Sequence, residues 1–164
     1  MGYAIAEYFL GNNAKVILIS GPVGIELRHQ NLQIIRVNTA EEMYNNCMVF
    51  SKEADIIVMA AAVADYTPVE ISDKKIKKES QSEFYIKLKP TKDILKELGT
   101  IKTQNQILIG FALETNDEKV NAVKKLEKKN LDFIVLNSMN DAGAGFGYDT
   151  NKITIIDKNH KEYR

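Results

Sequence analysis

The residues best suited to chemistry in this sequence lie in one stretch, where an apolar run leads to a carboxylate and then to clustered lysines. Ile56 to Met59 and three alanines precede Asp65, and the lysines that follow are Lys74, Lys75, Lys77 and Lys78. A carboxylate can hold a sugar hydroxyl, and clustered ammonium groups can bind a polyphosphate. The stretch therefore suits a ligand that carries both groups. In the alternative interpretation the alanines only pack and the lysines form a solvated loop, and composition alone favours neither.

The composition excludes several other kinds of site. The 164 residues include 22 Lys and Arg and 22 Asp and Glu, so a zero net charge gives no reason to expect nucleic acid or a membrane as a partner. Cys47 is the single cysteine, which indicates a buried thiol in a reducing compartment. The two histidines match no metal-ligand spacing, so we expect no metal-ligating residues. Because the sequence shows neither a membrane-spanning run nor a signal peptide, we expect a cytoplasmic protein.

The elements that must position these residues alternate between helix and strand. Helical periodicity covers residues 1–10, 39–52, 94–98 and 116–129, and runs typical of strands cover 15–20, 33–37, 56–59, 107–111 and 133–136. This order predicts a single α/β domain over residues 1–164 with a mostly parallel sheet, in which 56–59 is a buried central strand. Residues 152–163 predict a C-terminal antiparallel hairpin. Since the chain opens in a helix, we expect the first strand of the sheet to be missing.

Local signals predict several boundaries. Thr39 with Glu42, and Thr115 with Glu118, have the spacing of helix capping boxes. Residues 65–68 are predicted to turn, and the alternation over 84–88 predicts a half-buried strand. A short helix is predicted after residues 90–93, where Thr91 or Asp93 can cap the free amides.

The helix predicted over residues 116–129 carries two lysines on one face. Val120, Val123 and Leu126 are predicted to face inward. Lys125 and Lys129 are four residues apart, so their ammonium groups share a face. Without other evidence such lysines are surface charges that the helix macrodipole favours.

Together, the strand ends present a set of groups better suited to binding a nucleoside triphosphate than to attacking a substrate. This set comprises Asp65, the lysine cluster, Phe111, Asn137 and the lysine-bearing helix. The sequence shows no Ser-His-Asp order and no closely spaced carboxylate pair. A substrate carboxylate can instead act as the nucleophile, if the protein orients it in line with the α-phosphate and supplies cations.

Several segments occur in the order in which they occur in one family, along essentially the whole chain. These segments are residues 1–6 (MGYAIA), 20–23 (SGPV), 61–66 (AAVADY), 75–78 (KIKK), 92–95 (KDIL), 110–115 (GFALET), 135–137 (VLN) and 145–146 (GF). In them the chain resembles the phosphopantothenoylcysteine synthetases of coenzyme A biosynthesis, usually the C-terminal half of a bifunctional bacterial protein. The resemblance indicates that the lysines at 74–78 and the two helix lysines bind a ligand and are not only solvated surface charges.

The resemblance implies a Rossmann-like, doubly wound fold, usually dimeric, and a two-step ligase reaction. With Mg²⁺, CTP reacts with the carboxylate of 4′-phosphopantothenate to give an acyl-cytidylate and pyrophosphate, and ATP replaces CTP in some members. The amine of L-cysteine then displaces the nucleoside monophosphate and forms an amide. In a parent chain the domain can be fused to a flavin-dependent phosphopantothenoylcysteine decarboxylase domain.

The resemblance also assigns roles to residues. Met59, Ala60 and Ala61 contribute backbone contacts to the nucleotide, and Asp65 holds its polar groups. Lys75 meets the triphosphate and, with Asn137, is a candidate catalytic residue. The other nucleotide-binding candidates are Lys92, Asp93, Ile94, Leu95, Phe111, Lys125 and Lys129.

Departures from the family pattern bear on activity. The family's upstream strand and its turn with an asparagine that acts on the acyl intermediate are absent. We therefore expect a synthetase domain truncated at its N-terminus, which keeps part of the nucleotide site but is deficient in turnover. Thr67 stands where arginine is common, and Leu113 where alanine is common. The alternative function is a non-catalytic nucleotide- or dinucleotide-binding Rossmann domain, and the choice between CTP and ATP stays open.

Overall fold

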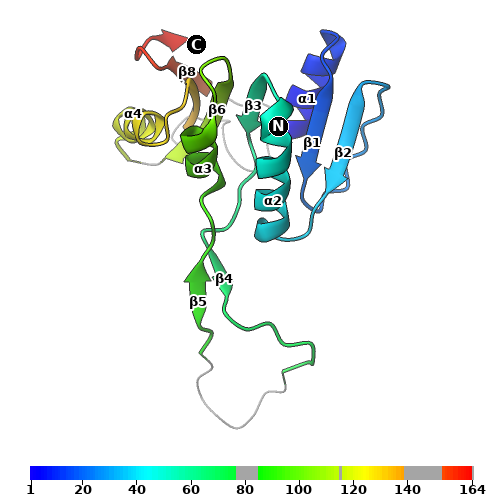
Figure 1. Ribbon diagram of the computed structural model, residues 1–164. Coiled ribbons are helices and arrows are strands. Elements are labelled where there is room, and N and C mark those ends of the chain that lie inside the picture. Colours follow the sequence, from blue (N-terminus) through cyan, green and yellow to red (C-terminus); the bar gives the residue numbers. More distant parts are fainter. Residues whose placement is uncertain (77–84, 115, 139–152, 164) are drawn as a thin grey trace.

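The computed structural model describes residues 1–76, 85–114, 116–138 and 153–163 (Figure 1). Its helices are α1 (Gly2–Gly11), α2 (Ala40–Phe50), the short 3-10 helix η1 (Ser51–Glu53), α3 (Ile94–Ile101) and α4 (Glu118–Lys128). Its strands are β1 (Val16–Ser20), β2 (Leu32–Arg36), β3 (Ile56–Met59), β4 (Tyr66–Pro68), β5 (Leu88–Pro90), β6 (Ile107–Glu114), β7 (Phe133–Ser138), β8 (Ile153–Asp157) and β9 (Glu162–Tyr163). Within these described ranges, no helix is long and apolar enough to cross a membrane.

The strands form a large mixed sheet, a separate parallel pair, and an arm that contains the antiparallel pair β4 and β5. The large sheet has the order β3-β6-β7-β8-β9, in which β3, β6 and β7 are parallel and β8 and β9 are antiparallel. β1 and β2 form the parallel pair. These pairings confirm the predicted α/β fold with a mostly parallel sheet and a C-terminal antiparallel hairpin.

The position of β3 differs from the prediction of a buried central strand. Among the described strands it pairs only with β6, so it lies at the edge of the five-stranded sheet, and Ile56 is 41% exposed. β1 likewise pairs only with β2. α2 joins the two pieces, because Met43 and Cys47 belong to a core against which Ile19 of β1 and Ile57 of β3 pack.

Two glycines allow α3 to pack closely on its neighbours. A Cβ atom at Gly110 of β6 would lie 2.8 Å from side-chain atoms of Leu95 and Leu131. A Cβ atom at Gly99 of α3 would overlap the backbone carbonyl oxygen of Lys129. Since a larger residue at either position requires a neighbour to move, these glycines set how near α3 lies to β6 and to the end of α4.

The first predicted capping box is confirmed. The Glu42 N–H donates to the Thr39 hydroxyl oxygen at 3.1 Å, and the Glu42 carboxylate accepts from the Thr39 N–H at 3.3 Å. The second predicted capping box, Thr115 with Glu118, does not begin α4, so that prediction is wrong. This helix begins after Asp117, whose side chain makes no capping hydrogen bond. Thr115, the other half of that prediction, lies outside the described residues.

The buried face of α4 is also rotated from its prediction. Ala122 and Leu126, four residues apart, are buried, and Val123 packs against the core. Val120 is 55% exposed. It is two residues from Ala122 and therefore about 200° around the helix from it, so it cannot share the buried face.

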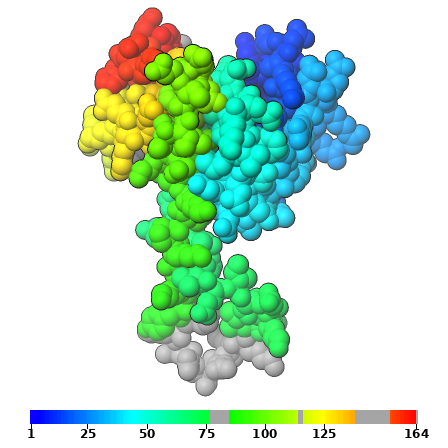
Figure 2. Space-filling view, viewed as in Figure 1, coloured from blue at the N-terminus to red at the C-terminus, as the bar shows by residue number. Residues whose placement is uncertain are grey.

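The arm replaces two predicted features. Residues 65–68, predicted as a turn, include β4, which pairs antiparallel with β5. The half-buried strand predicted over 84–88 is wrong in its described part, because Tyr85 is 83% exposed and the strand lies at Leu88–Pro90. Figures 1 and 2 show that this arm projects from the body of the molecule, so neither of its faces packs on the core.

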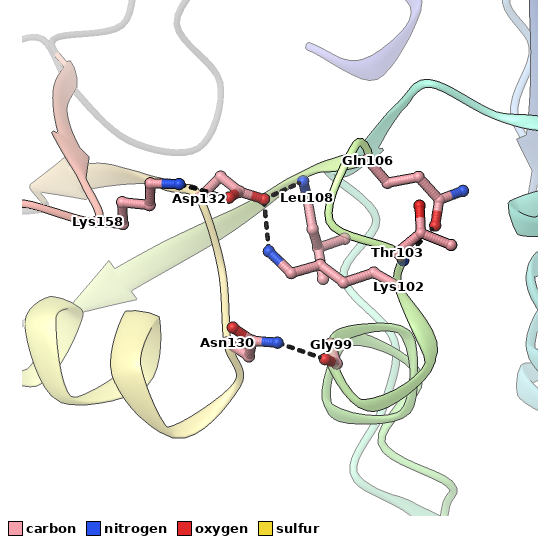
Figure 3. Close-up of polar contacts among 8 residues, drawn as sticks. All are labelled: Gly99, Lys102, Thr103, Gln106, Leu108, Asn130, Asp132 and Lys158. Atoms are coloured by element: carbon pink, nitrogen blue, oxygen red, sulfur yellow. Dashed lines mark hydrogen bonds and ion pairs between the residues drawn. The ribbon is translucent and has the colours of Figure 1, made fainter.

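At the amino ends of β6 and β7, Asp132 joins several elements (Figure 3). Its Oδ2 atom accepts from the Lys102 ammonium group at 2.6 Å and from the Leu108 N–H at 2.8 Å. Lys158, after β8, lies 3.8 Å from Oδ1. Burial by itself would raise the pKa of Asp132, but the hydrogen bonds from Lys102 and Leu108 outweigh it and hold this pKa below its usual value. The contacts fix the sheet from the edge opposite to the predicted site.

Candidate functional site

The carboxyl ends of β3, β6 and β7 lie at one edge of the sheet, as the sequence predicted. Met59 is in register with Gly110, and Phe111 with Val135. Leu113 is in register with Asn137. Since side chains alternate along each strand, Phe111 and Asn137 are on the same face of the sheet, two residues apart along the strand direction. Both are half-buried.

Ala60 and Ala61 continue this edge after β3. Ala60 is half-buried and Ala61 is exposed, so neither places a bulky group over the strand ends. Gly2, at the start of α1, approaches the same place, because a Cβ atom on it would lie 3.9 Å from the Ala60 Cβ. A ligand can thus come close to the backbone of residues 59–61, which fits the role predicted for them.

Thr91 connects the segment between β3 and β4 to the start of α3. Its N–H donates to the Asp65 carbonyl oxygen at 2.8 Å, and its hydroxyl donates to the Ala64 carbonyl oxygen at 2.6 Å. The base of the arm is therefore closed at this residue. As a result the exposed Asp65 lies beside residues 92–95, although they are distant in sequence. Sequence analysis treated Thr91 only as a possible cap, and no pattern indicated this connection.

Residues 92–95 contribute different groups to the edge. The Lys92 ammonium group lies 4.3 Å from the centre of the Tyr44 ring, so this side chain is directed to α2 by a cation–π contact. Ile94 and Leu95 are 4% and 8% exposed, and their side chains belong to the core. Only the backbone groups of Ile94 and Leu95 remain for a ligand, and the amides of a first helical turn lack partners within the helix. Tyr44 is a site neighbour that sequence analysis missed, since only the fold brings α2 to Lys92.

The two helix lysines point at the site rather than into solvent. Lys125 donates from Nζ to the Phe111 carbonyl oxygen at 2.8 Å. Lys129 forms an ion pair with Asp93 at 2.9 Å, and its side chain is 19% exposed. Asp93 is the N-cap of α3 and accepts from the Lys96 N–H at 3.1 Å. The interpretation of both lysines as plain surface charges is therefore wrong.

The charge around Asp93 is set by these lysines. Burial raises the pKa of the Asp93 carboxyl group, whereas the hydrogen bonds from Lys129 and the Lys96 N–H lower it, and the charges of Lys129 and Lys125 lower it further. The pKa of Asp93 therefore lies below the ordinary value of an aspartate, so Asp93 is ionised at neutral pH. Two ammonium groups and one carboxylate thus gather beside the amino end of α3, a cationic balance that suits an anionic ligand.

Asn137 carries a buried polar atom that is not satisfied within the described part of the chain. Its Oδ1 atom accepts no hydrogen bond from any residue that the structure describes. A buried acceptor without a donor is unfavourable, and such groups concentrate where a ligand or water completes the bonding. This supports Asn137 as a site residue.

Lys75 is not brought together with the strand ends. It is exposed and follows β4 in the chain, on the arm that Figure 1 shows projecting from the body. Lys77 and Lys78 of the same cluster lie outside the described residues. Within the described part of the chain, the structure therefore assembles the candidate site from Asp65, residues 91–95, Phe111, Asn137 and the two helix lysines, without Lys75.

Comparison with known proteins gives consistent matches along the chain. The profile of the family described as "DNA/pantothenate metabolism flavoprotein C-terminal domain" matches residues 1–164. The coenzyme A biosynthesis bifunctional protein CoaBC of Bacillus subtilis (strain 168) is 47% identical over 162 residues, which cover 98% of this chain and 39% of that protein. A cysteine/cysteine sulfinic acid decarboxylase of an unknown prokaryotic organism is 52% identical over 160 residues, covering 98% of this chain and 44% of that protein.

Solved structures agree with these sequence matches. The crystal structure of the C-terminal domain of CoaBC superposes with a TM-score of 0.79 at 34% identity, covering 99% of this chain and 70% of that one. The DNA/pantothenate metabolism flavoprotein of Streptococcus pneumoniae, at 22% identity and a TM-score of 0.78, shares the fold.

The chain spans less than half the length of the two curated relatives named above. Its matched residues nevertheless extend from the first position to the last. The resemblance recognised in the sequence motifs is confirmed, and the chain belongs to the family of DNA/pantothenate metabolism flavoprotein C-terminal domains, homologous to the C-terminal domain of CoaBC.

Proposed function

We propose that this chain is the phosphopantothenate–cysteine ligase domain of coenzyme A biosynthesis, and that it uses CTP to activate 4′-phosphopantothenate for reaction with L-cysteine. The observation that carries the proposal is the direction of Lys125 and Lys129, which bring cations to the edge where Phe111 and Asn137 lie. The 47% identity to CoaBC, named as a protein of coenzyme A biosynthesis, supports the choice of pathway.

In the first step, a carboxylate oxygen of 4′-phosphopantothenate attacks the α-phosphorus of CTP. The bond to the β-phosphate breaks, pyrophosphate leaves, and the acyl-cytidylate remains. In the second step, the cysteine amine attacks the acyl carbon, CMP leaves, and the amine loses a proton as the amide forms. Lys125 and Lys129 stabilise the negative charge on the phosphates, and binding both reactants in line supplies the remaining acceleration.

The other site residues bind and orient the nucleotide. Asp65 accepts hydrogen bonds from the ribose, Phe111 contacts the base, and the backbone of Met59, Ala60 and Ala61 contacts the nucleotide. Lys92 and the first amides of α3, at Ile94 and Leu95, add further contacts. The Oδ1 atom of Asn137, which has no partner among the described residues, accepts a hydrogen bond from the incoming amine. We further propose that Lys75 meets the triphosphate, as the resemblance implies.

Magnesium fits this site as an ion carried by the triphosphate. Mg²⁺ is usually held by one or two carboxylates together with substrate phosphates. Among the residues that the structure describes, no three His, Cys, Asp and Glu side chains are grouped as a metal site, but the exposed Asp65 lies at the strand ends. When bound, Mg²⁺ neutralises part of the triphosphate charge. ATP is the alternative cosubstrate.

Full turnover requires a further strand between β1 and β3. Each has one edge without a partner among the described strands, and the residue that starts α1 lies beside Ala60, at the carboxyl end of β3. A parallel strand that leads into α1 would pair with both open edges. We propose that a segment outside residues 1–164 supplies it, so that this chain alone binds CTP but forms little product.

The arm suits a homodimer. Tyr66, Ile71, Tyr85 and Ile86 on it are each more than 60% exposed, so the arm offers a partner several large apolar side chains. Sedimentation equilibrium tests this, and a monomer at micromolar concentration contradicts it.

We place the reaction in the cytoplasm, where the buried thiol of Cys47 stays reduced. Any decarboxylase activity of a parent protein, such as a fused flavin-dependent domain, is assigned to residues outside this chain.

The experiment that tests the proposed function is pyrophosphate release in the presence of CTP, 4′-phosphopantothenate and L-cysteine, measured on a chain extended at its N-terminus to the length of the CoaBC C-terminal domain. Release that requires 4′-phosphopantothenate supports the ligase. Binding of CTP without release by the extended chain supports the alternative, a non-catalytic nucleotide-binding domain.

A further inference from the structure

Asp93 lies where α3, α4 and the base of the arm meet. Its carboxylate caps α3 by accepting a hydrogen bond from the Lys96 N–H. The same carboxylate forms an ion pair with Lys129 at the end of α4. Two residues earlier, Thr91 is hydrogen-bonded to Ala64 and Asp65. The backbone before Asp93 is therefore held to the segment between β3 and β4, and its side chain is held to α3.

The ion pair fixes the position of the Lys129 ammonium group. Nζ lies 3.0 Å from Oδ1 and 2.9 Å from Oδ2 of Asp93, so both carboxylate oxygens contact it. A lysine at a helix end would otherwise sample many rotamers and lose that freedom on binding a ligand. Because an ammonium group has three donors, one remains for a further acceptor.

We infer that Asp93 is a positioning residue of the nucleotide site, whose carboxylate holds the Lys129 ammonium group ready for the phosphates of the nucleotide. This inference rests on the proposed function. The negative charge of Asp93 would by itself repel a triphosphate, but Lys129, the nearby charge of Lys125 and the amino end of α3 compensate it. The gain from a lysine that is already ordered therefore outweighs the repulsion.

The variant Asp93→Asn separates the two roles of this carboxylate. Asparagine caps helices as well as aspartate does, but it carries no charge for Lys129. We expect thermal unfolding without ligand to stay nearly unchanged, and the dissociation constant of CTP with Mg²⁺, measured by titration calorimetry, to rise about tenfold. Asp93→Ser, a second neutral cap, should show the same loss of affinity and serves as the replacement if the asparagine variant is unstable.

A double-mutant cycle with Lys129→Met shows whether Asp93 acts through Lys129. If it does, Asp93→Asn adds nothing to Lys129→Met, and the double variant binds CTP as weakly as Lys129→Met alone. Inorganic tripolyphosphate, a probe without base or ribose, should show the same pattern of affinities, because Lys129 is proposed to bind the phosphates and not the base or ribose.

Three results are decisive against the inference. Losses that add in the double variant would mean that Asp93 does not act through Lys129. Unchanged or tighter CTP binding by a stably folded Asp93→Asn would mean that the carboxylate does not assist binding. Failure of the unaltered chain to bind CTP would overturn the proposed nucleotide site together with the inference, so the two failures are distinguishable.

Discussion

The Lys125 ammonium group donates a hydrogen bond to the Phe111 backbone carbonyl at 2.8 Å, and so links α4 to the end of β6. The same contact places a positive charge beside a residue predicted to touch the nucleotide base. Lys124, the preceding residue on α4, is exposed to solvent instead. Lys125 and Lys124 therefore allow a charge in the site to be compared with a charge outside it on the same helix.

We predict that Lys125→Met weakens CTP binding by about tenfold or more, because a hydrogen bond that involves a charged group contributes roughly 1.5–3 kcal/mol. Lys124→Met, which removes the same charge from the helix, should change the affinity less than about twofold. Calorimetric titration of both variants measures this. Equal losses in the two would show that only the overall charge of α4 matters.

The environment of Asp132 predicts unequal effects of its two lysines on stability. Lys102 is 10% exposed and lies 2.6 Å from the carboxylate, whereas Lys158 is 67% exposed and lies 3.8 Å away. Lys102→Met should lower the free energy of unfolding by about 2–3 kcal/mol, and Lys158→Met by less than about 0.5 kcal/mol. Urea denaturation measures both values, and similar values would contradict the assigned geometry.

Asp132 should also contribute to the pH dependence of stability. Its pKa in the folded chain is lower than its ordinary value of 3.8. The carboxylate therefore stabilises the fold fully above the unfolded pKa, and this contribution is lost as the pH falls through the folded pKa. We predict that Asp132→Asn lowers the unfolding free energy at pH 7 and reduces its decline below about pH 4, measured by urea denaturation across this range. A decline as steep as that of the unaltered chain would contradict the prediction.

The thiol of Cys47 should be inert in the folded protein. Burial raises its pKa from 9.0 to about 11, so the reactive thiolate is scarce at pH 8. We expect a disulfide reagent such as dithiobis(nitrobenzoic acid) to modify Cys47 only after unfolding in guanidinium. Rapid modification of the native chain at pH 8 would show that α2 does not cover this residue.

The two close glycines should respond differently to alanine. At Gly99 the added methyl group would meet the Lys129 backbone carbonyl, whereas at Gly110 it would meet the ends of the Leu95 and Leu131 side chains. Backbone yields less than a side-chain tip, so Gly99→Ala should lower the unfolding free energy by about 3 kcal/mol and Gly110→Ala by about 1–2 kcal/mol. Thermal unfolding of both variants tests the order, and the reverse order would contradict it.

The parts of the fold that the sequence predicted depend on local patterns. The apolar run at Ile56–Met59 and the capping box at Thr39 were found because their signals lie within a few residues. The arm was missed because β4 and β5 pair with each other outside the core, so burial imposes no alternation on them. The motifs predicted the candidate site residues, but the pairing of Asp93 with Lys129 depends on the close approach of α3 and α4 at Gly99, which no local pattern encodes.

The central claim, that the strand ends bind CTP, is tested most directly by thermal unfolding of this chain with CTP, ATP or NAD, each with Mg²⁺, and by the same measurement on Lys125→Met. We predict that CTP at a hundred times its dissociation constant adds about 2.7 kcal/mol to the unfolding free energy, that NAD adds none, and that the same CTP concentration stabilises Lys125→Met clearly less. Unchanged unfolding with both triphosphates, or equal stabilisation by NAD, would contradict the claim.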